Sequence, residues 1–282
     1  MPDREPPRFD RRWFLAAGGL TALAAACGNA ATSAGTDGAS GSSTLSAPET
    51  PAGTATTSTG GPSSSGPSIS APTTKTSAAG PAPFFVSAGS TDNVALTFHT
   101  NGDLTQVKAV LDIVEKHGAV LTAFIVGNWL DANPSMGKRL LDGRHELANH
   151  TYTHPSFEQL SPAAMATEIT KCRDAIAKVS GSSGRYFRLS GTDDGTAKPS
   201  NAALVAAATA GYAGVAGFDV DPLDYKDPGK QAVIDRTLQT VKGGSIISLH
   251  MGHAGTIDAI GPILDGLASK NLKPVTLSTL MA

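Results

Sequence analysis

Apolar runs of strand length alternate with helix-like patterns through residues 84–282 of this 282-residue chain. The runs at 94–98, 120–126, 186–188, 214–218, 245–249 and 274–277 predict strands. Apolar residues spaced three and four apart predict helices between them, at about 104–117, 161–179, 200–210, 230–241 and 257–268. This alternation indicates βαβ units and a parallel α/β sheet, open or closed into a barrel. In both forms a site is expected just past the carboxyl ends of the strands.

The first residues of the chain have the features of an export signal. Arg11 and Arg12 precede an uncharged apolar stretch at 13–26, which is too short for the roughly 20 residues that span a bilayer. Residues 10–15 resemble a twin-arginine signal, and residues 23–28 resemble a lipobox in which Cys27 would be lipidated. We therefore expect a signal peptide at 1–27 and an exported protein. It would be held at the outer face of the cytoplasmic membrane as a lipoprotein, or secreted if the signal is an ordinary cleaved one.

Residues 28–83 are rich in Ser, Thr, Gly, Pro and Ala, and their only charges are Asp37, Glu49 and Lys75. Such a segment cannot bury enough apolar surface to offset the entropy of ordering it. We expect a disordered tether at 28–83 and a single folded domain at 84–282.

The charge balance bears on the partners of the protein. The chain has 22 Lys and Arg against 24 Asp and Glu, a net charge of −2. This balance argues against a nucleic-acid partner, which a basic surface would indicate. Contact with a membrane is expected only through the N-terminal lipid anchor, and we expect a monomer.

Polar residues follow several of the predicted strands. His99 follows the run at 94–98, His250 follows the run at 245–249, and Arg188 ends the run at 186–188. His150 and His154 follow the short run at 146–149, and their spacing can place two imidazoles on one face of a turn, as in many zinc sites. We expect these side chains to converge at one mouth of the sheet.

The sequence around these residues is similar to the motifs of a known family. Residues 143–150, His154 and Pro155 resemble the second motif of the polysaccharide deacetylase family, also called carbohydrate esterase family 4 or the NodB homology domain. Residues 95–98, 187–188, 221–225 and 246–250 resemble its first, third, fourth and fifth motifs, in that order. The resemblance covers about 94–277 and implies a distorted (β/α) barrel of the polysaccharide deacetylase type.

The resemblance also implies an activity and roles for individual residues. The family removes acetyl groups from polysaccharides with a divalent metal, for which zinc is expected first and cobalt, manganese or nickel are alternatives. His150 and His154 would be metal ligands, and Asp221 would pair with His250 and hold that imidazole as a general acid. The residues expected to contact substrate are Tyr225, Asp224 and Gly191.

The first motif differs from the family pattern at its two acidic positions. The family has two aspartates there, a general base followed by a metal ligand, whereas this chain has His99 and Thr100. Either Asp103 supplies the carboxylate ligand and His99 acts as base, or His99 is the third ligand of a three-histidine zinc site. We favour the first slightly because it keeps the charge at the metal. Asp103 also suits the N-cap of the helix that begins at Leu104.

The third motif departs from the pattern after Arg188, where the family has two prolines and an aromatic residue. In the family this arginine orients the base aspartate. Next to His99, a fixed cation would lower the imidazole pKa and keep the ring neutral for work as a general base. A salt bridge from Arg188 to Asp193 or Asp221 is an equally open interpretation.

The function expected from the sequence is metal-dependent hydrolysis of carbon–nitrogen bonds in acetylated glycan, with removal of N-acetyl or O-acetyl groups. Peptidoglycan and chitin-like polymers are the expected substrates. Because the first motif is altered, two alternatives remain: a non-catalytic glycan-binding module on the same scaffold, or a hydrolase of another amide or ester.

Overall fold

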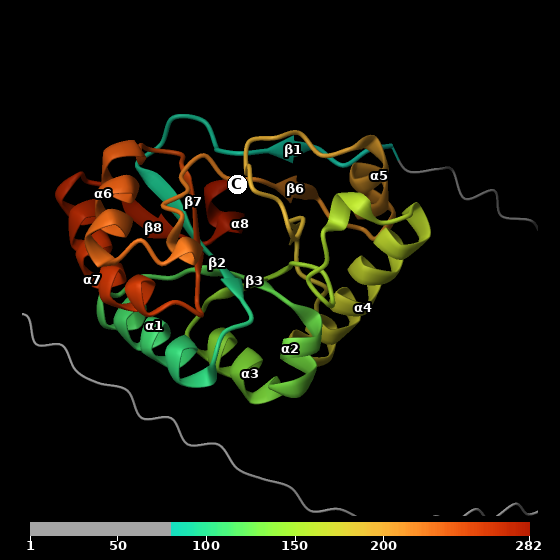
Figure 1. Ribbon diagram of the computed structural model, residues 1–282, viewed down its shortest axis with the longest axis horizontal. Helices are drawn as coiled ribbons and strands as arrows, with labels where there is room; N and C mark the ends of the chain where they lie inside the picture. Colours follow the sequence, from blue (N-terminus) through green and yellow to red (C-terminus); the bar gives the residue numbers. More distant parts are fainter. Residues whose placement is uncertain (1–79) are drawn as a thin grey trace, which may run out of the picture. The chain divides into compact units, whose positions relative to one another are not determined.

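The computed structural model describes residues 80–282, which form a parallel sheet of eight strands wrapped by helices (Figure 1). The order of the strands is β1-β6-β5-β4-β3-β2-β7, and β8 pairs with β2 beside this path. Their bounds are β1 Phe84–Phe85, β2 Asn93–Thr100, β3 Thr122–Ile125, β4 Glu146–Asn149, β5 Tyr186–Phe187, β6 Gly214–Ala216, β7 Ile246–His250 and β8 Lys273–Val275. The predicted parallel α/β sheet is therefore confirmed.

The sheet curls until its two ends meet. Val220, just past β6, forms a parallel bridge with Ile247 of β7, and the Ser248 amide donates to the Val220 carbonyl at 2.9 Å. Each strand then has a face toward the inside of a barrel and a face toward the helices. Successive side chains along a strand alternate between these faces. This arrangement fits the distorted barrel expected from the resemblance.

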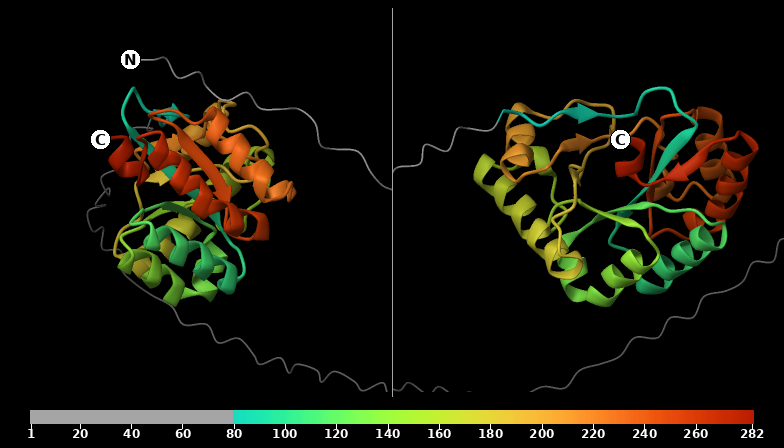
Figure 2. Two further views of the ribbon diagram at one scale, coloured as in Figure 1. Left: turned by 90° about the vertical axis from the view of Figure 1, so that its left-hand side faces the viewer. Right: turned by 180° about the vertical axis from the view of Figure 1, so that it is seen from behind.

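The helices cover the outside of the barrel, as Figures 1 and 2 show. In α1, Val107, Val110, Leu111 and Val114 are buried against the sheet, and these are the residues whose spacing predicted the helix. The helices are α1 Leu104–Lys116, α2 Gly127–Ala132, α3 Pro134–Asp142, α4 Pro162–Ser180, α5 Asn201–Thr209, α6 Lys230–Thr240, α7 Ala254–Ser269 and α8 Leu277–Leu280, with short 3-10 turns η1 Phe157–Gln159 and η2 Asp224–Lys226.

The inside of the barrel is filled in layers. Apolar side chains from six strands, among them Ala95, Phe124 and Ile246, form one buried cluster with Leu277 and Leu280 of α8. Further along the same inward faces stand polar residues, which include Thr97 and then His99 on β2. The barrel is thus apolar toward one end and polar toward the other, where the strands finish.

No helix within residues 80–282 is long and apolar enough to span a bilayer. The predicted signal at 1–27, lipidation of Cys27 and nearly all of the tether at 28–83 lie outside the described residues. These three expectations remain predictions.

Candidate metal centre

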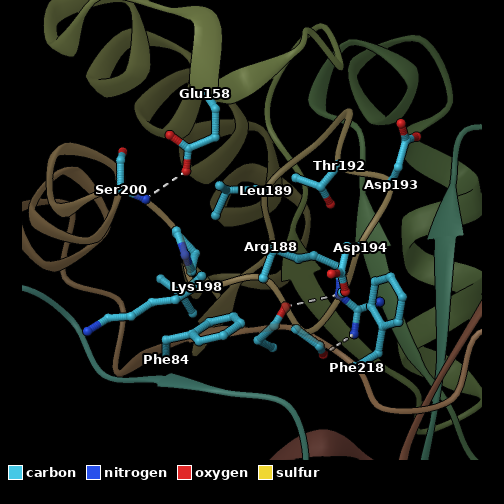
Figure 3. A pocket seen from close by; sticks show the side chains of 16 residues that line it. Phe84, Glu158, Arg188, Leu189, Thr192, Asp193, Asp194, Lys198, Ser200 and Phe218 are labelled. Atoms are coloured by element: carbon cyan, nitrogen blue, oxygen red, sulfur yellow. Dashed lines mark hydrogen bonds between the residues drawn. The ribbon is translucent and has the colours of Figure 1, made fainter.

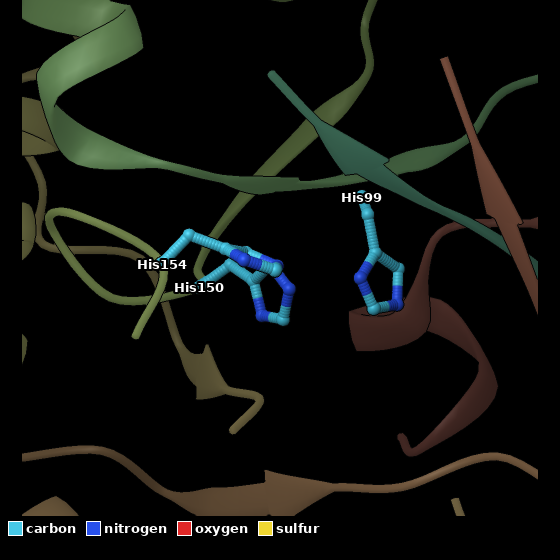
Figure 4. Close-up of side chains that lie close together, drawn as sticks. All are labelled: His99, His150 and His154. Atoms are coloured by element: carbon cyan, nitrogen blue, oxygen red, sulfur yellow. The ribbon is translucent and has the colours of Figure 1, made fainter. Parts of the chain in front are cut away.

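Three histidines meet where the inward faces of β2 and β4 end. His99 is on β2, His150 directly follows β4, and His154 lies on the loop after it. One ring nitrogen from each lies within 4.8 Å of the others, and the imidazoles face one another (Figure 4). Nitrogen ligands of tetrahedral zinc lie about 3.4 Å apart, because each Zn–N bond is about 2.0–2.1 Å.

His150 shows most directly that this cluster suits a cation. Its Nδ1 lies 3.0 Å from the backbone carbonyl of Arg188, which makes Nδ1 the protonated nitrogen and leaves a lone pair on Nε2. Nε2 is buried and has no hydrogen-bond partner in the described part of the chain. Leaving a buried acceptor unpaired is costly, and a metal ion is the partner that such a nitrogen commonly takes.

His99 is held from its other side. Its Nε2 lies 3.0 Å from the Ser248 hydroxyl of β7, and its ring centroid lies 4.3 Å from that of His150. Burial lowers the pKa of His99 well below its usual value, and the neighbouring His150, His250 and Arg188 lower it further. Burial likewise lowers the pKa of His150 and of His154. Neutral imidazole is the form that binds metal.

A histidine–carboxylate pair stands beside the cluster. The Nδ1 of His250 lies 2.8 Å from Oδ1 of Asp224, a side chain that is fully buried. The ring centroid of His250 is 4.2 Å from that of His99 and 5.2 Å from that of Tyr225. Because Nδ1 is taken by the carboxylate, Nε2 is the nitrogen available for proton transfer.

The chain was compared with known proteins. Residues 87–215 match the family model described as polysaccharide deacetylase. A chitooligosaccharide deacetylase of Sinorhizobium fredii is 32% identical over 164 residues, which cover 57% of this chain and 72% of that protein. The chain belongs to the polysaccharide deacetylase family.

Other relatives and solved structures are similar over comparable lengths. A chitooligosaccharide deacetylase of Rhizobium leguminosarum bv. phaseoli is 31% identical over 51% of this chain, which spans 61% of that relative. A peptidoglycan-N-acetylglucosamine deacetylase of Bacillus cereus is 28% identical over 67% of this chain and 87% of its own. A family 4 carbohydrate esterase from Streptomyces lividans, solved with acetate, superposes with a TM-score of 0.59 at 28% identity, over 66% of this chain and 92% of that one. A family 4 pseudoenzyme from Bacillus anthracis has the same fold, with a TM-score of 0.65 at 21% identity over 71% of this chain and 69% of that one.

Asp103 does not join the histidine cluster. Its carboxylate is exposed, accepts from the Thr105 amide at 2.8 Å and caps α1. The structure therefore supports the alternative in which His99 is the third nitrogen donor, and the preference for Asp103 as ligand was wrong. The reason is local, because a carboxylate at an N-cap is held by the amides of the first helical turn.

The carboxylate that pairs with His250 is Asp224, not Asp221 as the family motif suggested. Asp221 instead accepts from the Leu223 amide at 2.8 Å, and burial raises its pKa. Leu223 has a positive φ of 56°, which turns the chain sharply between the two aspartates. The expected role of Asp224 in contacting substrate is also corrected, since its carboxylate faces His250 and Thr256.

Arg188 has no carboxylate partner within residues 80–282. Its guanidinium donates to Thr97 Oγ1 at 2.9 Å and to the carbonyls of Ala216 and Gly217 at 3.2 and 3.1 Å, and it lies over the ring of Phe124. Burial lowers its pKa to about 9. The alternative of a salt bridge to Asp193 or Asp221 is not observed. Arg188 is a buried support that ties β2, which carries His99, to the end of β6.

Gly191 and Tyr225 have different surroundings. Gly191 has a φ of 64°, and a Cβ there would lie 2.9 Å from Ser156 Cα, so its space is already filled by the loop after His154. Gly191 itself is exposed, and its expected contact with substrate stays a prediction. Tyr225 stands beside His250, where an aromatic wall was expected.

A cavity of about 570 Å³ is lined by Arg188 and Phe218, and none of the three histidines lines it (Figure 3). The Phe218 ring centroid lies 6.5 Å from that of His99. The outer wall of the cavity is the segment 192–200, which carries Asp193 and Asp194.

Ser248 and Thr97, which hold His99 and Arg188, were not found from the sequence. The two-residue alternation that places them on the inward faces was the available signal.

Proposed function

We propose that this protein is a metal-dependent deacetylase that removes N-acetyl groups, with O-acetyl groups as the second substrate class, from an amino-sugar polymer. The observation that carries the proposal is the buried Nε2 of His150, which has no hydrogen-bond partner within residues 80–282 and clusters with nitrogens of His99 and His154. The deacetylase names of the relatives from Sinorhizobium fredii and Bacillus cereus support the same reaction class.

The three histidines would hold the metal. All three donors are neutral nitrogens, a set that suits zinc first and also cobalt or nickel. A divalent ion there supplies Lewis acidity to the acyl carbonyl and to water. The contact from His150 Nδ1 to the Arg188 carbonyl fixes the tautomer of that ligand, and the contact from His99 Nε2 to the Ser248 hydroxyl orients the His99 ring.

With His99 assigned to the metal, His250 is the residue that handles the proton. We assign both halves of the transfer to its Nε2, which takes a proton from the attacking water and returns it to the departing nitrogen. The C–N bond breaks, acetate leaves, and the sugar retains a free amine. Asp224 keeps the proton of neutral His250 on Nδ1, so that Nε2 is free for this transfer. The ring of Tyr225 lies beside the His250 imidazole.

The substrates we propose are peptidoglycan or chitin-like glycans, met outside the cell. A twin-arginine signal and lipidation of Cys27 would keep the protein, as a monomer, at the outer face of the cytoplasmic membrane. Fractionation of cells that express the wild-type chain and a Cys27→Ala variant tests this location. Equal recovery of both forms in the membrane fraction would contradict the lipid anchor.

Metal analysis of the purified chain, combined with acetate release from N-acetylglucosamine oligomers and from peptidoglycan, tests the activity. We expect one divalent ion per chain and metal-dependent acetate release. Both should be lost in His150→Ala and kept in His117→Ala, a control at the end of α1. Full metal occupancy without acetate from any acetylated glycan would favour the glycan-binding module instead.

A further inference from the structure

A second hollow, which we call the Asn groove, is lined by His154 and shares no lining residue with the cavity of Figure 3. Its volume is about 390 Å³, and it is open to solvent. The loop after β2, α2 with the residue on either side of it, and the loop after β4 form its walls. The lining residues are Asn101, Val126, Asn128, Trp129, Ala132, Asn133, Thr153 and His154.

The groove offers unused hydrogen-bonding groups. Asn101 and Asn128 are exposed, and their side chains make no hydrogen bond to the described part of the chain. Each amide presents two N–H donors and a carbonyl acceptor. Asn133 donates from Nδ2 to the Trp129 carbonyl at 2.8 Å, which leaves its own carbonyl oxygen for a ligand. Mixed donors and acceptors on short side chains match the hydroxyl groups of a sugar.

The walls of the groove are held in place before any ligand binds. Trp129 donates from Nε1 to the Gly102 carbonyl at 2.9 Å, which fixes its indole plane. Gly102 is packed so closely that a Cβ would lie 2.8 Å from Gly252 Cα. On the other wall, the amide and hydroxyl of Thr153 both donate to the Glu168 carboxylate, at 2.8 and 2.9 Å. Preorganised walls reduce the entropy lost on binding.

The charge of the groove indicates the class of ligand. None of its eight lining residues is Asp, Glu, Lys or Arg, and His154 is the only titratable group among them. An ionic ligand would have no counter-charge here, whereas a neutral polyol would find amides and an indole.

We propose that the Asn groove is a subsite for a neutral pyranose ring of the glycan. This ring would be the neighbour of the one whose acetyl group reaches the histidine cluster. Only the placement of that adjacent ring, with its acetyl group at the histidine cluster, rests on the proposed function. Binding of sugar to the groove itself needs neither metal nor turnover, so the two ideas can fail separately.

Tryptophan fluorescence gives a direct measurement. The chain has two tryptophans, and only Trp129 lies within residues 80–282. In the full chain carrying Trp13→Phe, titration with N-acetylglucosamine oligomers should change the emission of Trp129. We expect Asn128→Ala and Asn101→Ala each to weaken trimer binding about 3- to 10-fold, the range of one or two neutral hydrogen bonds. Binding of the single sugar should change far less.

The controls separate this proposal from the catalytic one. Asn201→Ala, at an exposed asparagine that begins α5, should leave trimer affinity unchanged. His150→Ala should lose metal and acetate release while Trp129 still responds to the trimer. If wild-type protein releases no acetate but the asparagine variants bind more weakly, the subsite stands and the proposed function fails. If the wild-type chain releases acetate and both variants bind trimer as tightly as it does, the subsite is wrong.

Discussion

The carboxylate of Asp224 contacts both the imidazole and the backbone amide of His250. Oδ1 lies 2.8 Å from the imidazole Nδ1, and Oδ2 accepts a hydrogen bond from the backbone amide of the same residue at 2.7 Å. The Thr256 hydroxyl also donates to Oδ2, at 2.6 Å. The ring of His250 therefore has one orientation, set by a group that is itself buried and fully bonded.

Replacement of Asp224 should impair proton transfer with little change in substrate binding. In Asp224→Asn we expect kcat for acetate release to fall about 10²-fold, within the usual range for general acid–base catalysis, with KM nearly unchanged. The matched variant Asp221→Asn should lose much less, because Asp221 contacts Leu223 and not His250. A larger loss in Asp221→Asn would restore the pairing that the family motif suggested.

The third metal ligand can be identified by metal affinity alone. His99→Ala should weaken zinc binding at least 10-fold, as measured by competition with a chelator, because one of three nitrogens is lost. Asp103→Ala should bind zinc as the wild type does, but melt at a lower temperature because the cap of α1 is removed. Loss of zinc in Asp103→Ala with retention in His99→Ala would reverse the assignment.

Stability of the metal-free protein should fall on acidification below about pH 6.5, the ordinary pKa of histidine. Burial lowers the folded-state pKa of His99 and His150, so the unfolded chain takes up protons first as the pH falls. The stabilisation from these groups is complete above that pH and is lost as the pH drops toward the folded values. Urea unfolding at pH 7.5, 6.5 and 5.5 measures the effect. His150→Gln should show a shallower pH dependence, and an unchanged slope would contradict this origin.

Arg188 should prove important for folding rather than for chemistry. Arg188→Lys cannot reach Thr97, Ala216 and Gly217 together, and each buried group left unpaired costs about 1–3 kcal/mol. We expect a clear loss of unfolding free energy in urea. Zinc affinity should change little, because His150 bonds to the backbone carbonyl of Arg188 and not to its side chain. Arg185→Lys, at an exposed position nearby, is the control.

Local sequence pattern was enough to predict most of the framework. The helix at 104–116 and the strand at 93–100 have the buried faces that their apolar spacing indicated. The short helices α2 and α3 were missed because six and nine residues carry too little periodicity. Residues 274–277 were expected as one strand, but Leu277 begins α8, which closes the apolar end of the barrel.

The site was predicted less completely, because its details depend on turns. The His150–His154 spacing predicted two members of the histidine cluster, since both follow β4 on one short loop. The choice between His99 and Asp103 depended on where β2 ends and α1 begins. The choice between Asp221 and Asp224 depended on the positive φ of Leu223, a conformation that a leucine rarely adopts and that the sequence did not signal.

His99 and His250 are register partners in the parallel pairing of β2 with β7. Backbone hydrogen bonds between adjacent strands therefore fix the separation of their Cα atoms near the interstrand spacing of about 4.8 Å. Neither residue depends on a surface loop for that separation. Insertions or exchanges in the loops around the mouth would thus leave the spacing of these two histidines unchanged. In the proposed deacetylase, the choice of polymer and the chemistry are therefore free to diverge independently.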